Sequence, residues 1–208
     1  EGLEERGEMH VGGGGYCGIA PLSSTHANVA FVLDQGQMAP AGGDIEGFYR
    51  SALERRWPRI AERLARATLS ETPRAIGPLA LLARRVSAPG VLLVGDAAGF
   101  HDPFTGEGVT LALRSAEMAS QVAHQALQAA PPGDLGLYDH RRRAATEAKF
   151  RFNRLLQAVV GRPALANLVA HRLAGRPELA DRLVGIAGDF VPARAALGPG
   201  FLLRMLVG

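Results

Sequence analysis

A short apolar run that ends in Gly-Asp most constrains what this 208-residue chain can fold into. Residues 91–94 read Val-Leu-Leu-Val, which is typical of a strand buried on both faces of a parallel or mixed sheet. Gly95-Asp96 follows at the carboxyl end of that strand, where α/β sheets bind their ligands. Residues 109–127 then place apolar side chains at helical spacing. The order predicts an interior strand, a turn, a glycine loop and a helix packed on the sheet.

The Gly-Asp pair and the loop suit a ligand with hydroxyl groups and negative charge. Gly95 has no side chain, so backbone and ligand can approach closely. The carboxylate of Asp96 can accept a hydrogen bond from a sugar or polyol hydroxyl. Residues 105–108, Thr-Gly-Glu-Gly, lead into a helix N-terminus, whose free N–H groups favour anions such as the pyrimidine edge of a reduced flavin. Glu107 is expected to act there through its charge rather than as an acid or base, and a Gly-Asp pair alone is also a common turn.

The whole string over residues 91–115 resembles the second FAD motif of the geranylgeranyl-reductase-like flavoproteins. These belong to the superfamily of the para-hydroxybenzoate-hydroxylase-type monooxygenases. The resemblance implies that Asp96 binds the ribityl chain of FAD and that Pro103 and the glycine turn lie against the isoalloxazine ring. The implied cofactor-binding residues are Gly95, Asp96, Pro103, Thr105, Gly106 and Gly108. His101 is a candidate proton donor beside the ring, and the alternative is that it orders the turn.

A second segment, residues 16–21, resembles the Tyr-x-Trp-x-Phe-Pro segment of the same family. Tyr16 and Pro21 are kept, whereas Gly18 and Ala20 stand where the family has Trp and Phe. The family segment borders the substrate cavity, so the resemblance implies that Tyr16 and Pro21 face the substrate. The loss of two large aromatic side chains implies a wider cavity, or one lined by other groups.

The strand, G-x-G-x-x-G turn and helix that hold the FAD pyrophosphate in such enzymes are not found. Gly12–Gly15 is not followed by a helical pattern, so we expect a sheet bend or loop there. We therefore expect the fingerprint to lie N-terminal to Glu1, and the isolated chain not to be a self-sufficient flavoprotein. The alternative is a truncated, non-catalytic module that binds an apolar ligand or another subunit.

The remaining patterns predict an α/β (α+β) protein. Residues 8–34 read as strands, most simply a β-hairpin. Asp44 is predicted to cap a helix, and Pro58 to lie in the first turn of the next. Residues 135–208 read as helical hairpins with breaks near Gly161, Gly175, Pro192 and Pro199.

These elements predict a partial FAD-binding Rossmann-like domain with substrate-domain β-strands and a C-terminal helical region. Residues 1–88 are assigned to substrate-domain strands and helices, 89–130 to the C-terminal part of the FAD-binding domain, and 131–208 to the helical region.

Charge and cysteine usage bound the partners and the compartment. Residues 131–208 carry 12 basic and 6 acidic side chains, a net of +6, whereas residues 1–130 have a net of −3. The preferred explanations are Arg-rich codon usage for this charge and a docking helix for the apolar residues 201–207; the alternative is peripheral contact with anionic lipid. The Arg141–Arg143 run lacks interleaved aromatics, which argues against nucleic acid. Cys17 is the single cysteine, which excludes a disulfide framework and a cysteine-based metal site.

We expect no metal and no transmembrane helix, because no apolar run approaches 18 residues. The single Cys17, which is expected to pack rather than react, fits a reducing compartment. We therefore expect a cytoplasmic protein, with peripheral contact at the inner face of the membrane as an alternative.

The leading functional hypothesis is an FAD-dependent oxidoreductase that positions an apolar or aromatic small molecule against the flavin. The preferred reaction is reduction of a carbon–carbon double bond, because residues 102–108 resemble the reductase branch more closely. An FAD-dependent monooxygenase is the alternative, since a fold alone does not decide the reaction. NAD(P)H is a candidate electron donor.

Overall fold

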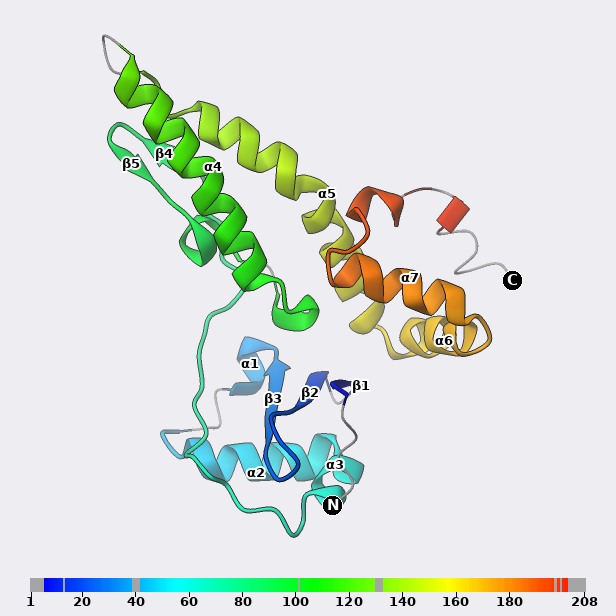
Figure 1. Cartoon of the computed structure of the whole chain (residues 1–208). Coiled ribbons are helices and arrows are strands. Elements are labelled where there is room, and N and C mark those ends of the chain that lie inside the picture. The colour runs from blue at the N-terminus through cyan, green and yellow to red at the C-terminus, as the bar shows by residue number, and fades with distance from the viewer. Residues whose placement is uncertain are drawn as a thin grey trace. The chain divides into compact units, whose positions relative to one another are not determined.

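The computed structural model describes residues 6–12, 14–38, 42–100, 102–129, 133–196, 198 and 200–201. The chain forms two compact units, whose helices and strands are labelled in Figure 1. The first comprises Glu1–Gly77 and Ala158–Ala166, and the second comprises Pro78–Gln157 and Asn167–Gly208. The three-part division by function drawn from the sequence stays a prediction.

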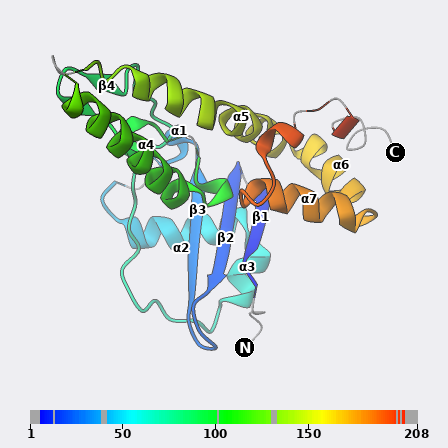
Figure 2. The ribbon, with the colours of Figure 1, turned by 45° about the horizontal axis from the view of Figure 1, so that its top comes forward.

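A three-stranded antiparallel sheet organises the first unit. Its strands β1 (Glu8–Gly12), β2 (Gly15–Pro21) and β3 (Ala27–Leu33) lie in the order β1-β2-β3. The predicted strands are therefore confirmed, and the expected hairpin is extended by a third strand. Figure 2 shows the three strands side by side.

Three helices follow the sheet: α1 (Gln35–Met38), α2 (Ile45–Arg56) and α3 (Pro58–Arg63). Asp44 caps α2 as predicted, since its Oδ1 accepts a hydrogen bond of 2.8 Å from the Gly47 amide. Pro58 begins α3, where its missing N–H costs nothing because that amide has no intrahelical acceptor.

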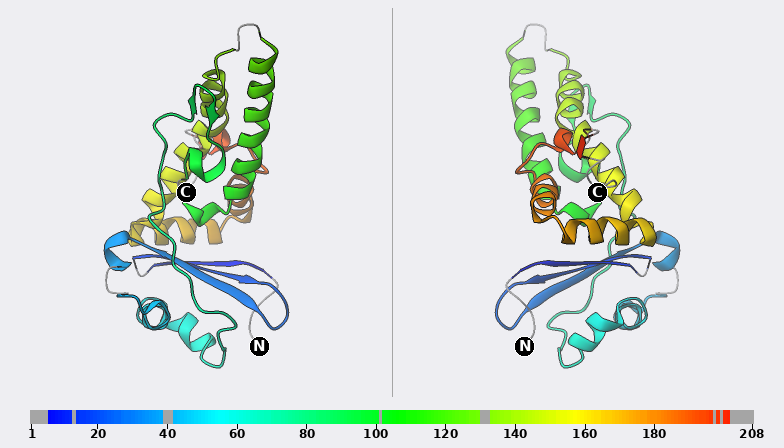
Figure 3. Two further views of the ribbon diagram at one scale, coloured as in Figure 1. Left: turned by 90° about the vertical axis from the view of Figure 1, so that its left-hand side faces the viewer. Right: turned by 90° about the vertical axis from the view of Figure 1, so that its right-hand side faces the viewer.

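The alternation of β2 builds the core of this unit. Cys17 and Ile19 lie on one face of the sheet, which α2 and α3 cover in Figure 3. They pack there against Leu53, Trp57 and Ile60. Because side chains alternate along a strand, the residues between them lie on the other face.

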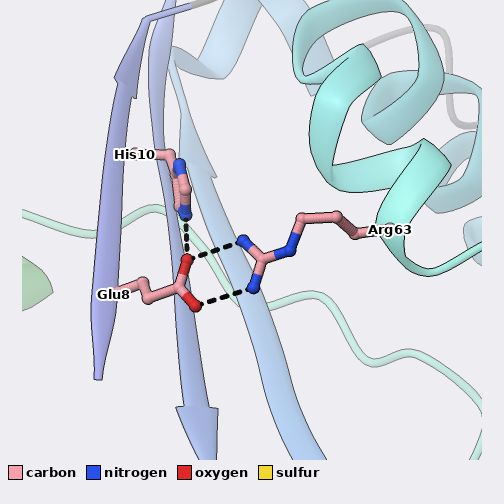
Figure 4. Close-up of polar contacts among 3 residues, drawn as sticks. All are labelled: Glu8, His10 and Arg63. Carbon is pink, nitrogen blue, oxygen red and sulfur yellow. Dashed lines mark hydrogen bonds and ion pairs between the residues drawn. The ribbon is translucent and has the colours of Figure 1, made fainter. Parts of the chain in front are cut away.

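An ion-pair cluster joins β1 to α3 at the edge of the sheet (Figure 4). Both carboxylate oxygens of Glu8 accept hydrogen bonds of 2.8 Å from the Arg63 guanidinium. The ring Nε2 of His10 lies 2.7 Å from the same carboxylate. The bonds from Arg63, and then that from His10, lower the pKa of Glu8 to about 2.

The second unit is mainly helical. Its short strands are β4 (Ser87–Ala88) and β5 (Val91–Leu92), and the 3₁₀ turns η2 (Gly95–Ala98) and η3 (Pro103–Thr105) follow. The helices are α4 (Gly108–Gln128), α5 (Leu137–Val160), α6 (Pro163–Ala174) and α7 (Pro177–Ala187), followed by the 3₁₀ turn η4 (Ala193–Ala195). The end of α5 and the start of α6 fall within Ala158–Ala166, which belongs to the first unit. The ends of α5 and α6 confirm the breaks predicted near Gly161 and Gly175. Helices and strands together confirm the mixed α/β class.

Two apolar clusters form the core of the second unit. In the first, α4 contributes Ala119 and Val122, which pack against Ala98 and Tyr138. The hydroxyl of Tyr138 also donates a 2.8 Å hydrogen bond to the Leu93 carbonyl. The second cluster joins α5 to α7 and the segment after it, and its buried members are Phe152, Leu179, Ile186, Ala193, Ala196 and Phe201.

The prediction of an interior strand over residues 91–94 is wrong. Only Val91–Leu92 forms a strand, and it pairs with β4 in a two-residue antiparallel ribbon. Val91 is 51% exposed and Val94 39% exposed. The physical reason is that β5 has only one neighbour, since no other strand in the described ranges pairs with it.

The predicted helix over 109–127 is confirmed. α4 buries Ser115, Ala119, Val122 and Ala126, whereas Leu113 is 68% exposed. Small side chains on the buried face allow the close approach of the Gly95 turn. None of the helices in the described part of the chain has the length and apolar character needed to cross a bilayer.

Candidate functional site

Gly95 places the turn after β5 directly against α4. Its backbone adopts φ +57°, a left-handed conformation that favours glycine. A Cβ at this position would lie 3.2 Å from the Cβ of Ala112, so the absence of a side chain also permits the close packing. The Gly95 amide donates a 2.9 Å hydrogen bond to the Ser115 hydroxyl. Glycine is therefore needed here for both conformation and space.

Asp96 presents a free carboxylate at the start of α4. The residue is exposed, and within the described ranges no group donates a hydrogen bond to its side chain. A Cβ built on Gly108 would lie 3.9 Å from Asp96 Oδ1, which places the carboxylate beside the first residue of the helix. An exposed acceptor of this kind can hold a ligand hydroxyl.

The N-terminus of α4 carries no side-chain cap. Glu107 is the N-cap residue, but its carboxylate accepts no hydrogen bond from the amides of the first turn. The carboxylate instead pairs with the Lys149 ammonium and accepts a 3.0 Å bond from the Thr105 hydroxyl. The buried Lys149 ammonium thus neutralises the negative charge that Glu107 was predicted to place at the helix N-terminus. The N–H groups of the first turn have no acceptor within the helix.

The loop before α4 is held by two hydrogen bonds to one carboxylate. Asp102 Oδ1 accepts a 2.7 Å bond from the Phe104 amide and so caps η3. Asp102 Oδ2 accepts a 2.8 Å bond from Gln157 Nε2 on α5. Pro103 begins η3, and Gly106 ends it at φ +69° with no atom within 4 Å of the position a Cβ would take.

The residues predicted to bind the cofactor therefore fall into two sets. Gly95, Asp96 and Gly108 gather at the junction of η2 and α4. Pro103, Thr105 and Gly106 form the 3₁₀ turn that precedes it. His101, the candidate proton donor, lies outside the described residues. That these residues bind a flavin stays a prediction.

The residues predicted to face the substrate belong to the first unit. Tyr16 is buried and Pro21 is half-buried at the end of β2. Cys17 lies on the sheet face that α2 and α3 cover, and burial raises the pKa of its thiol to about 11. A thiol with a raised pKa is a poor nucleophile, which supports the expected packing role.

The spacing Gly-x-Gly-x-x-Gly does occur over residues 13–18, in the part of the chain expected to form a loop. Gly15 and Gly18 lie in β2, however, so the segment leads into a strand instead of a helix. A dinucleotide fingerprint needs the helix N-terminus to hold the pyrophosphate. The spacing therefore carries no such site.

Sequence reasoning missed Lys149. It is the only lysine in a chain whose other basic side chains are arginines. A single lysine among arginines was the one sequence feature that could have drawn attention to this position. The structure shows the Lys149 ammonium buried against Glu107. The motif and the helical region are thus joined by a contact that no spacing pattern indicated.

Hollows elsewhere in the described surface carry none of the motif residues. One of about 470 Å³ is lined by residues 67–72 together with Glu46 and Arg50 of α2. Another of about 300 Å³ is lined by Arg182, Ala195, Gly198, Gly200 and Phe201. Neither brings together groups suited to the chemistry of the Gly95–Asp96 turn.

Comparison with known families decides the wider assignment. A family model described as an FAD binding domain matches residues 7–153, which is well over half of the chain. The chain belongs to this FAD-binding domain family. Membership confirms the resemblance to FAD-dependent oxidoreductases, and the matched range includes both the Gly-Asp motif and Lys149.

Curated relatives of this FAD-binding chain carry the name digeranylgeranylglycerophospholipid reductase. The protein of Methanothrix thermoacetophila is 32% identical over 62% of this chain and 31% of its own length. That of Methanococcoides burtonii, digeranylgeranylglycerophospholipid reductase 1, is 34% identical over 56% of this chain and 26% of its own. The chain therefore spans about a third or less of these relatives.

Solved structures similar to this FAD-binding chain include the crystal structure of pqsL, a probable FAD-dependent monooxygenase from Pseudomonas aeruginosa. The two share 26% identity with a TM-score of 0.49, over 88% of this chain and 47% of the other. A second structure, of PqsL in complex with 2-aminobenzoylacetate, gives a TM-score of 0.48 at the same identity.

Proposed function

We propose that this chain supplies one wall of the flavin site of an FAD-dependent oxidoreductase. The observation that carries the proposal is the exposed Asp96 carboxylate, which has no donor within the described ranges and lies beside the start of α4. It occurs on a segment that the FAD binding domain family matches. The residues present fit the cofactor, because a free acceptor and uncapped helix amides suit a polyol chain and an anionic ring.

Each residue then has a distinct role toward the cofactor. Asp96 accepts a hydrogen bond from a ribityl hydroxyl, and Gly95 lets the backbone come close to it. The amides of the first turn of α4, which begins at Gly108, favour the anionic pyrimidine edge, and Gly106 lies in the turn before them. Pro103 and Thr105 would pack against the ring. FAD, when bound, supplies the electron transfer, and these residues bind and orient it.

The substrate we propose is an apolar chain, and the face of the first unit's sheet opposite α2 and α3 supports it. Met9 and Val11 are exposed on this face, and they pair across the strands with Gly18 and Tyr16 respectively. Gly18 and the exposed Ala20 are small, so this face carries no bulky side chain where the family has aromatics. Exposed apolar side chains such as Met9 and Val11 favour hydrocarbon over polar ligands.

The reaction we propose is reduction of a carbon–carbon double bond in a polyprenyl-type chain. The support is the name shared by the curated relatives, digeranylgeranylglycerophospholipid reductase, at 31–34% identity for three of them. The sequence of residues 102–108, which resembles the reductase branch more closely, supports the same reaction. A monooxygenase would use the same cofactor wall, so the two reactions must be separated by their products.

The test is product mass. A form of the protein that loads FAD is reduced anaerobically with dithionite and offered a geranylgeranyl lipid, which should gain two hydrogen atoms for each double bond reduced. A parallel aerobic reaction with NAD(P)H should leave the lipid without added oxygen. Gain of one oxygen atom would replace the reductase by a monooxygenase, and a lipid unchanged in both reactions would favour a non-catalytic module. Asp96→Ala serves as the control that lowers flavin loading.

A further inference from the structure

A single buried ammonium links the glycine loop to the helical region of the second unit. Lys149, on α5, is 5% exposed, and its Nζ pairs with the carboxylate of Glu107, which is 7% exposed. The same Nζ donates to the carbonyl of Ile186 and, at 3.2 Å, to that of Ala187. It also lies 5.4 Å from the centre of the Phe152 ring.

The groups around Lys149 Nζ match an ammonium in the number of acceptors and in charge. An ammonium has three N–H donors, and here it meets three acceptors: one carboxylate and two carbonyls. The two carbonyls belong to the last turn of α7, where the helix dipole favours a cation. A guanidinium is planar and larger, so arginine does not reproduce this arrangement. This accounts for the one lysine in an otherwise arginine-based chain.

The pair determines the charge at the start of α4. Glu107 is the N-cap residue, and its carboxylate is also held by the Thr105 hydroxyl. An unpaired carboxylate there would repel an anion brought to the first-turn amides. Removing one partner of a buried pair also leaves an uncompensated charge, which is strongly destabilising.

We propose that Lys149 is a positioning residue for the flavin-facing loop. It neutralises Glu107 and holds residues 105–108 against α5 and α7, so that the first-turn amides of α4 stay available to an anionic ligand edge. Toward the flavin, this inference rests on the proposed function. Toward the loop, it can be tested without any cofactor.

The first experiment measures hydrogen–deuterium exchange in residues 102–111 of the chain without flavin. Lys149→Met should raise exchange of the hydrogen-bonded amides of Phe104, Gly106 and Leu111 by tenfold or more, and Lys149→Arg should not keep them at the wild-type rate. Glu107→Gln with Lys149→Met removes both charges, so the double variant should fold and exchange at an intermediate rate. Arg151→Met is the matched control, since it removes an exposed cation from the same helix and should leave the loop unchanged.

The second experiment uses the FAD-loaded protein and measures its FAD dissociation constant and flavin midpoint potential. Lys149→Met should weaken binding by about tenfold and lower the potential, because the Glu107 carboxylate then opposes the anionic reduced ring. The double variant should return the midpoint potential most of the way to the wild-type value, because it also removes the Glu107 charge. A merely structural role would not predict this recovery.

Outcomes separate this inference from the proposed function. Loop exchange that stays at the wild-type rate in both Lys149→Met and the double variant would overturn the positioning role. A Lys149-dependent loop in a form of the protein that includes a dinucleotide fingerprint and still binds no FAD would retain the positioning of the loop and contradict the proposed function instead. A midpoint potential that stays lowered in the double variant would overturn the electrostatic part of the inference.

Discussion

The core of the first unit and the junction of α4 with the Gly95 turn in the second unit use apolar side chains in opposite ways. In the first, β2 and the helices contribute large residues that close a core, with Ile19 against Trp57 and Ile60. In the second, the face of α4 that packs on the Gly95 turn is made of small residues, and Leu113 on its other side is exposed.

Large buried residues in the first region stabilise the fold, whereas small residues in the second determine how closely the Gly95 turn approaches α4. Large side chains in the first unit remove apolar area from water, which is where most folding free energy arises. Small side chains in the second allow Gly95 to reach Ser115 and Ala112, and so leave the Asp96 carboxylate at the surface. The first region should therefore respond to mutation mainly in stability, and the second mainly in ligand binding.

The largest expected effect is on the first unit. Trp57→Ala removes a buried ring that lies 5.4 Å from that of Phe31 and should lower the free energy of unfolding of this unit by about 3–5 kcal/mol. Urea unfolding of the isolated chain measures it. Trp57→Phe should cost clearly less, because the buried Nε1 donor that it removes has no acceptor in the described residues. Equal losses for both variants would contradict this account of the core.

The next effect tests the close approach in the second unit. Gly95→Ala forces a side chain into a left-handed conformation, which costs about 1–2 kcal/mol, and also places a Cβ against Ala112. Gly90→Ala is the matched control, since Gly90 has φ +75° but no atom within 4 Å of the added Cβ. Thermal unfolding should show a larger loss for Gly95→Ala. If the two variants lose the same stability, the packing argument is wrong.

A smaller effect concerns pH and the first unit. The pKa of Glu8 is lowered from 4.5 to about 2 in the folded state, so its stabilising contribution is fully present above about pH 4.5 and is lost as the pH falls through about 2. Because the pair with Arg63 is partly exposed, we expect only about 0.5–1 kcal/mol. Glu8→Gln should flatten the pH dependence of stability between pH 4.5 and 2. If Glu8→Gln leaves the pH dependence of stability unchanged, the Glu8–His10–Arg63 cluster does not stabilise the first unit.

The smallest effect is expected on the exposed side of α4. Leu113→Gln should change the stability of the isolated chain by about 0.5 kcal/mol or less, because the side chain is mostly in water already. Chemical denaturation of this variant beside wild type is sufficient. A loss comparable to that of Trp57→Ala would mean that Leu113 is buried in solution, and the contrast between the two regions would fail.

Local chemistry made much of the fold predictable from the sequence. The Asp44 cap, the Pro58 helix start and the helix over 109–127 each follow from residue types at fixed spacing, and each is confirmed. The prediction of an interior strand over residues 91–94 was wrong because an apolar run does not reveal how many strands pair with it. The Lys149–Glu107 pair was missed because the two residues lie on different helical elements and no periodicity joins them.

Flavin affinity of Asp96 variants tests the central claim most directly. In a form of the protein that loads FAD, Asp96→Ala should bind FAD about one to two orders of magnitude more weakly, since a hydrogen bond to a charged group is worth about 1.5–3 kcal/mol. Asp96→Asn should lose less, because an amide oxygen still accepts, and the unfolding transition of both variants should match wild type. Fluorescence titration gives the three dissociation constants. If Asp96→Ala binds FAD as tightly as wild type, Asp96 is only a turn residue and the proposed flavin site is wrong.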